Sequence, residues 1–171
     1  INNLTIHDIG EAEIKDTIKL SKAKSFVVPY TEEYITPKKS VFNKMIFDSH
    51  LEYEFASFLD GRTDVKSFVK NFQEINFKIE YQNTEKNIYH YYPDFIIKLS
   101  NNDYWVVETK GIMTRDDELK FKRLQQWCVD VNNSAKINEK WDCMLLMDSK
   151  WRELIKTDLP GTFSEFVRLV K

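Results

Sequence analysis

Two carboxylates and a lysine stand where a β-hairpin could bring them together. Glu108 and Lys110 are two residues apart at the end of the apolar run 104–107, so their side chains project from one face of a strand. Asp94 opens the preceding apolar run, and the polar segment 100–103 between the two runs predicts an antiparallel turn. The hairpin therefore decides whether these three ionisable groups form a site.

The length of the turn sets the hairpin register. A three-residue turn or a bulge places Asp94 opposite Glu108, with both side chains on the same face. A two-residue turn at Asn101 and Asn102 would instead place Asp94 opposite Thr109, on the other face. The site hypothesis thus requires the longer turn or the bulge.

Two neighbouring carboxylates beside a lysine fit metal-assisted hydrolysis. Close carboxylates repel each other and raise each other's pKa unless a cation lies between them. One or two carboxylates with several waters suit Mg²⁺, and a lysine within reach could orient or deprotonate an attacking water. The alternative is an ordinary ion pair at a strand end, joining Lys110 to Glu108 or Asp94.

The spacing of these residues resembles a nuclease motif. The string YPDF at 92–95, followed by ETKG at 108–111, is similar to the signature of the PD-(D/E)XK nuclease superfamily. Three further blocks, at 47–56, 87–94 and 119–128, resemble the C-terminal endonuclease domain of the restriction (Res) subunit of type III restriction enzymes. The resemblance covers about residues 25–150.

This resemblance implies a Mg²⁺-dependent endonuclease that hydrolyses phosphodiester bonds of double-stranded DNA. Asp94, Glu108 and the Thr109 carbonyl would bind Mg²⁺, or Mn²⁺ in its place. Lys110 would position the water and stabilise charge in the transition state. The implied partners are DNA, a helicase-like translocase domain of the same polypeptide and a modification methyltransferase subunit, in the cytoplasm of a prokaryote.

Glu52 has two interpretations that both stay open. Ser49 predicts the N-cap of a helix that ends at Gly61, and Glu52 stands at the capping-box position three residues later. Glu52 also shares a helix face with Phe55, and it matches the acidic residue that many such nucleases direct at the metal-bound water or at the lysine. Glu54 lies on another face and is expected in solvent.

Lys120 and Arg123 are candidate DNA contacts. They are neighbours near the start of a helix predicted over 116–131, and they resemble family positions that approach the DNA backbone. The alternative is a solvated pair that balances the acidic residues 116–118 in the first helical turn.

Further elements follow from the apolar spacing. The sequence predicts a short helix over 11–22, a brief strand over 25–29, a loop over 31–40, a half-buried strand over 77–81, a buried parallel strand over 143–147 and a last helix that Thr162 caps and that runs to 170. With the hairpin, these elements predict an α/β fold: a restriction-endonuclease-like mixed β-sheet with helices on both faces.

Size and composition fit one globular unit. The chain has 171 residues, 42% of them hydrophobic, and a net charge of −2. Its near-neutral charge argues mildly against a DNA-binding protein that acts alone. We expect a lead-in segment at 1–40 and an endonuclease domain at 41–171, excised from a longer helicase-nuclease subunit. No apolar run approaches the ~18 residues of a membrane span, so no membrane partner is expected.

Two alternative functions remain at this point. One is a PD-(D/E)XK nuclease of another DNA-processing or phage-defence system. The other is a catalytically idle DNA-binding or docking module on the same scaffold. The first would change the partners, and the second would leave Asp94, Glu108 and Lys110 without a reaction.

Overall fold

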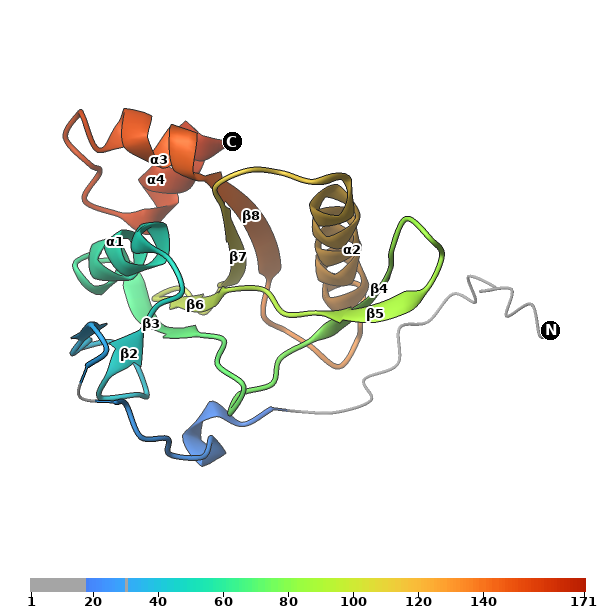
Figure 1. Ribbon diagram of the computed structural model, residues 1–171, viewed down its shortest axis with the longest axis horizontal. Helices are drawn as coiled ribbons and strands as arrows, with labels where there is room; N and C mark the ends of the chain where they lie inside the picture. The colour runs from blue at the N-terminus through green and yellow to red at the C-terminus, as the bar shows by residue number, and fades with distance from the viewer. Residues whose placement is uncertain (1–17, 30) are drawn as a thin grey trace.

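A mixed four-stranded sheet forms the centre of the described chain. The computed structural model describes residues 18–29 and 31–171, so most of the helix predicted over 11–22 lies outside the described residues. The central strands lie in the order β3-β6-β7-β8 (Figure 1). Their bounds are Val65–Lys70 for β3, Phe95–Leu99 for β6, Tyr104–Lys110 for β7 and Trp141–Met147 for β8.

The sheet combines antiparallel and parallel pairs, as the sequence predicts. β6 pairs with β3 and β7 in antiparallel fashion, and β8 runs parallel to β7. The connection from β7 to β8 is the long helix α2 (Arg115–Asn132). Because parallel neighbours need a crossover of this kind, α2 begins close to the end of β7 that carries Glu108 and Lys110.

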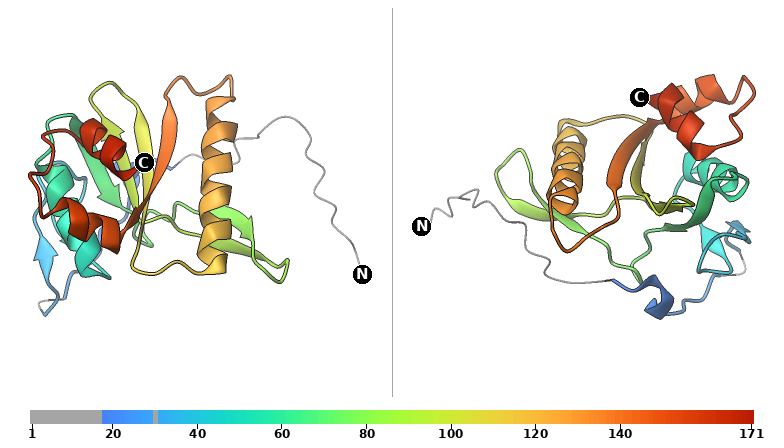
Figure 2. Two further views of the ribbon diagram at one scale, coloured as in Figure 1. Left: turned by 90° about the horizontal axis from the view of Figure 1, so that it is seen from above. Right: turned by 180° about the vertical axis from the view of Figure 1, so that it is seen from behind.

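Helices cover both faces of the sheet (Figures 1 and 2). On one face lie α1 (His50–Asp60), α3 (Asp148–Leu154) and α4 (Phe163–Val170). Alternation along β7 explains the two layers, because Val107 is buried with these helices while Val106 is buried with α2. The larger core is rich in aromatic side chains, among them Phe55, Phe95, Trp151 and Phe166.

The loop before β3 holds the C-terminal helix in place. The Asp64 carboxylate accepts hydrogen bonds from the backbone N–H groups of Phe163 (2.7 Å) and Ser164 (2.9 Å), and Thr162 caps the same helix as predicted. These free N–H groups at the first turn of α4 need acceptors. Residues about 100 positions apart in the chain therefore close the core together.

A small hairpin lies beside the central sheet. Its strands are β4 (Ile79–Gln82) and β5 (Ile88–Tyr91), which pair with each other in antiparallel fashion. Tyr81 and Tyr91 are buried in the core that α2 covers. β5 leads directly into Pro93 and Asp94, so this hairpin fixes the entry of the chain into the candidate site.

The turn between β6 and β7 has the length that the site hypothesis requires. Phe95 pairs with Val107, and the Leu99 N–H donates to the Asp103 carbonyl at 2.8 Å. The three residues between Leu99 and Asp103 form the turn, with Asn102 at a φ of 68°. This register, continued by one residue, sets Asp94 opposite Glu108.

Several expectations for minor elements are wrong. Residues 25–29 form no strand, because Phe26 is held by aromatic contacts to Phe42 and Phe72 instead of by a neighbouring strand. The expected loop over 31–40 contains β1 (Tyr34–Ile35), which pairs with β2 (Met45–Ile46). Within the described part of the helix predicted over 11–22, the structure has a 3-10 turn at Leu20–Lys22. The strands β2, β3 and β5 and the helix α3 were not predicted.

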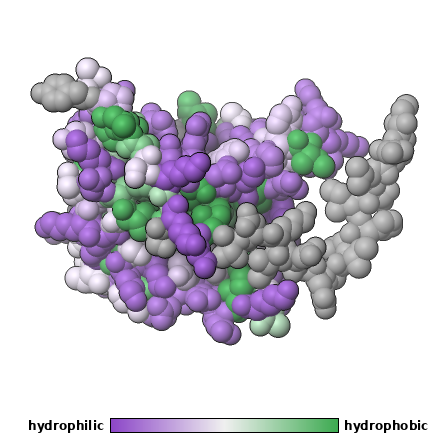
Figure 3. Space-filling view, turned by 90° about the horizontal axis from the view of Figure 1, so that it is seen from below, coloured by the Kyte–Doolittle hydropathy of each residue, from purple (hydrophilic) through white to green (hydrophobic). Residues whose placement is uncertain are grey.

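The surface is mixed in character. Figure 3 shows one face on which hydrophilic residues surround separate apolar patches, in keeping with a chain in which 30% of residues are charged. Over the residues that the structure describes, no helix combines the length and the apolar character that a membrane span requires.

The positive φ at Asn102 gives a test of the hairpin. Asn102→Val should lower the free energy of unfolding by about 1–2 kcal/mol, because a β-branched residue fits this backbone region poorly. Asn102→Gly, the matched control, should cost nothing, since glycine adopts this conformation readily. Urea denaturation measures both. Equal stability of the two variants would contradict the role assigned to this turn.

Candidate active site

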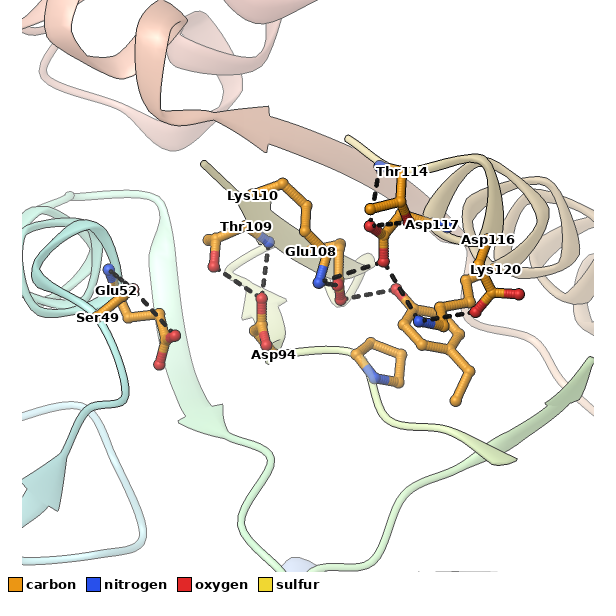
Figure 4. Close-up of polar contacts among 12 residues, drawn as sticks. Ser49, Glu52, Asp94, Glu108, Thr109, Lys110, Thr114, Asp116, Asp117 and Lys120 are labelled. Carbon is orange, nitrogen blue, oxygen red and sulfur yellow. Dashed lines mark hydrogen bonds and ion pairs between the residues drawn. The ribbon is translucent and has the colours of Figure 1, made fainter. Parts of the chain in front are cut away.

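The end of β7 presents a buried carboxylate bound to a lysine and a tyrosine (Figure 4). Glu108 is only 4% exposed. The Lys110 Nζ atom lies 2.9 Å from Glu108 Oε1, and the Tyr91 hydroxyl donates to Glu108 Oε2 at 2.7 Å. Because residues two apart in a strand share a face, β7 by itself brings Glu108 and Lys110 together.

Asp94, the residue directly before β6, lies at the same strand end. Its Oδ2 atom accepts hydrogen bonds from the backbone N–H and the hydroxyl of Thr109, both at 2.7 Å. Both hydrogen bonds that the Asp94 carboxylate receives within the described chain reach Oδ2. Its other oxygen, Oδ1, accepts no hydrogen bond from the described residues.

The two carboxylates raise each other's cost of ionisation. Burial raises the pKa of Glu108 from 4.5 to about 7, and repulsion from Asp94 adds to this, while Lys110 and Tyr91 oppose it. Burial also raises the pKa of Asp94, and the nearby charge of Glu52 acts in the same direction, although the Thr109 hydrogen bonds lower it. A cation between the two groups would lower both pKa values.

Asp117 is a member of this cluster that the sequence reasoning missed. It closes a capping box with Thr114 at the start of α2, and its Oδ1 atom lies 3.6 Å from Lys110 Nζ. Burial opposes ionisation, but the Thr114 hydrogen bonds and Lys110 lower the pKa of Asp117 to about 2. The spacing of Thr114 and Asp117 is a capping signal, and it could have identified this acid.

The two acids keep Lys110 charged. Burial lowers the pKa of Lys110, but the charges of Glu108 and Asp117 outweigh it and leave that pKa raised. A lysine with a raised pKa is protonated at neutral pH. Of the two roles that the sequence leaves open for Lys110, orientation and charge stabilisation fit this geometry, whereas proton abstraction does not.

Glu52 stands at the capping position that one of its two interpretations predicts, and its catalytic role stays a prediction. Ser49 caps α1 by accepting from the Glu52 N–H at 3.2 Å, so the N-cap prediction is confirmed. The Glu52 side chain is buried, 6% exposed, and its Oε2 lies 2.7 Å from the Nζ atom of Lys70. Lys70 belongs to β3, a strand whose irregular polar pattern gave no signal in the sequence.

The expectation that Glu54 lies in solvent is wrong. Its Oε2 atom accepts from the indole N–H of Trp151 at 2.9 Å and pairs with Arg152 at 2.8 Å. Helix α3, which the sequence did not predict, supplies both partners. Glu54 therefore joins α1 to α3 and is not a rival for the site.

Comparison with protein-family models relates this cluster of side chains to a known family. The family model described as an endonuclease domain matches residues 38–135, a stretch that contains Asp94, Glu108 and Lys110. The chain belongs to this endonuclease domain family. The curated proteins and the solved structures give no significant match. The mixed sheet with helices on both faces agrees with a restriction-endonuclease-like fold, so the predicted fold class is confirmed.

The two basic residues on α2 of this endonuclease domain already have acidic partners. Lys120 Nζ lies 3.2 Å from Asp116 and 3.3 Å from Asp117, and Arg123 pairs with Asp130 at 3.4 Å. This geometry is that of the charge-balancing alternative. Contact of Lys120 and Arg123 with DNA stays a prediction, as do the domain bounds 41–171.

The endonuclease domain offers oxygen ligands in a limited number. Within residues 18–29 and 31–171 there is no cluster of three or more His, Cys, Asp or Glu side chains arranged to hold a metal ion. A metal ion at this site would therefore depend on two carboxylates, backbone oxygen and water, which is a ligand set typical of Mg²⁺.

The raised pKa of Glu108 predicts that the folded protein becomes less stable as the pH rises. The folded state binds more protons than the unfolded state between the ordinary pKa of 4.5 and the folded value of about 7, so stability is lost across this interval. Between about pH 5 and about pH 8, metal-free Glu108→Gln should lose less stability than the parent chain, by about 2–3 kcal/mol.

Urea denaturation in the presence of a chelator at both pH values measures this difference. Glu118→Gln removes an exposed carboxylate from the same region and serves as the control, with the pH dependence of the parent chain. If Glu108→Gln showed the same pH dependence of stability as the parent chain, the conclusion that the fold raises the pKa of Glu108 would be wrong.

Proposed function

We propose that this endonuclease domain hydrolyses phosphodiester bonds of double-stranded DNA with Mg²⁺, or with Mn²⁺ in its place. One observation carries the proposal. In a chain of the endonuclease domain family, Asp94 and Glu108 meet at adjacent strand ends beside the ammonium of Lys110.

The donors of the site fit a hard divalent cation. Asp94 and Glu108 are desolvated and repel each other, and they would hold Mg²⁺ together with the Thr109 carbonyl. A bound Mg²⁺ would supply a Lewis acid for the phosphoryl oxygen and lower the pKa of a coordinated water. The mutual repulsion of the carboxylates supports this assignment, because a cation relieves it.

The protein's own groups act on the water and on the developing charge. Lys110 remains protonated between Glu108 and Asp117. It can therefore orient the attacking water and donate a hydrogen bond to the negative charge that grows on the phosphoryl oxygens. Tyr91 donates to Glu108 and fixes the direction of that carboxylate. Glu52 lies on the side of Asp94 away from Lys110 (Figure 4) and would be directed at the metal-bound water.

The wider assignment is a cleavage domain of a type III restriction enzyme. The resemblance of the blocks around the motif supports it, as does the family match over 38–135. We propose a helicase-like translocase domain of the same polypeptide and a modification methyltransferase subunit as partners, in the cytoplasm of a prokaryote. The net charge of −2 agrees with partners that hold most of the DNA, while Lys120 and Arg123 exchange acidic partners for phosphates.

Lys110→Ala tests the reaction. The variant should lose Mg²⁺-dependent nicking of supercoiled plasmid by at least about 100-fold, because a charge-stabilising donor disappears. Lys122→Ala removes an exposed lysine of α2 and should cleave like the parent chain. Undiminished nicking by a pure, folded Lys110→Ala protein would overturn the role of Lys110.

Asp94→Asn tests the ligand assignment without DNA. Calorimetric titration with Mn²⁺ should show binding to the parent chain and a loss of at least about tenfold in affinity in the variant, since an anionic oxygen ligand is replaced by an amide. Asp158→Asn, which alters an exposed acid elsewhere, should bind as the parent does. Equal affinity of the Asp94 variant would exclude this carboxylate as a ligand.

A further inference from the structure

Lys70 lies alongside the start of β6, the strand that directly follows Asp94. It is the last residue of β3 and pairs with Phe95 of β6. The N–H of Asn71, the next residue, donates to the backbone carbonyl of Asp94 at 2.8 Å. The backbone therefore fixes Lys70 next to the candidate metal site, although no role has been assigned to it so far.

The ammonium of Lys70 is buried among anionic and aromatic partners. The residue is 5% exposed. Its Nζ atom lies 2.7 Å from Glu52 Oε2 and also pairs with Asp48, and it stands over the rings of Phe47 and Phe72 at 5.9 and 5.6 Å. A buried ammonium is retained only when such partners compensate for its lost hydration, so these contacts hold the Lys70 ammonium in place.

Glu52 is the acid through which Lys70 reaches the site. Its negative charge raises the pKa of Asp94, and Figure 4 shows Glu52 on the side of Asp94 away from Lys110. Both Glu52 oxygens already accept hydrogen bonds. Oε1 accepts from the Ser49 hydroxyl at 3.0 Å, and Oε2 accepts from Lys70 and from the Asp48 N–H at 3.3 Å.

We propose that the Lys70 ammonium is a built-in cation that stands in for a second metal ion, so that the domain binds one divalent ion, at Asp94 and Glu108. The inference rests on the proposed function and specifies its metal stoichiometry. Two-metal sites hold their ions about 3.5–4 Å apart and share carboxylates between them. Here the acid that could serve a second ion beside Asp94 is neutralised by a fixed positive charge.

The two sides of Asp94 differ in the number of carboxylates gathered around one lysine. On the Glu108 side, Asp94, Glu108 and Asp117 surround the Lys110 ammonium, so negative charge is in excess there and a bound metal cation can relieve it. On the Glu52 side, Glu52 is the one buried carboxylate that Lys70 pairs with, since its other partner Asp48 is exposed. The Lys70 ammonium therefore balances Glu52, and its repulsion opposes a further divalent ion.

Counting bound Mn²⁺ tests this inference on the intact chain. Mn²⁺ is titrated at about pH 8 and followed by calorimetry and by the electron paramagnetic resonance of free Mn²⁺. The parent chain should bind one ion. Lys70→Gln should gain a second, weaker ion, and the double variant with Glu52→Gln should return to one. Lys70→Arg keeps the charge and serves as the matched control, with one ion.

The outcomes separate the inference from the proposed function. Two ions in the parent chain, one of them lost in Glu52→Gln, would overturn the role of Lys70 and leave the nuclease assignment standing. A single ion in folded Lys70→Gln would overturn that role as well. If the parent chain binds no Mn²⁺ ion, both the role of Lys70 and the metal assignment of the proposed function are overturned. Circular dichroism checks the fold, and the comparison of the parent chain with Glu52→Gln decides the matter if Lys70→Gln does not fold.

Discussion

The burial of like charges at one end of the sheet is the constraint on which the rest of the structure depends. Glu108 and Asp94 lie at adjacent strand ends, largely out of water, where burial and neighbouring carboxylates (Glu52 at Asp94, and Asp94 at Glu108) raise the pKa of both. Uncompensated buried charges destabilise a fold strongly. Positively charged side chains lie on both sides of the two carboxylates, Lys110 on β7 and Lys70 on β3. The hairpin register places the two carboxylates at the same end of the sheet.

The crossover helix takes part in this compensation. The first turn of a helix attracts anions, and Asp117 uses that position to complete the capping box of α2 and to pair with Lys110. The lysine is thus fixed between two acids from two different elements. Preorganisation of this kind favours stabilisation of charge that appears during a reaction, because the donor need not reorient.

Sequence reasoning succeeded where the determinants are local. The alternation along β7, the polar turn before it and the N-caps at Ser49 and Thr162 depend on residues within a few positions, and the structure has them. It failed where a partner is distant. Glu54 is held by a helix about 97 residues further on, and Lys70 lies on a strand without regular alternation, so neither position could be read from its neighbours. Asp117 is the exception, since its capping signal was local and was overlooked.

The hydrogen bonds between Asp64 and the first turn of α4 bear on where this domain could be cut without loss of its fold. The family match ends at residue 135, before β8, α3 and α4, yet these later elements cover one face of the sheet and pair with β7. A fragment cut at that border would expose a broad apolar surface and an open strand edge, both of which promote aggregation. The folded unit therefore includes the C-terminal helix α4 as well as the residues that the family match covers.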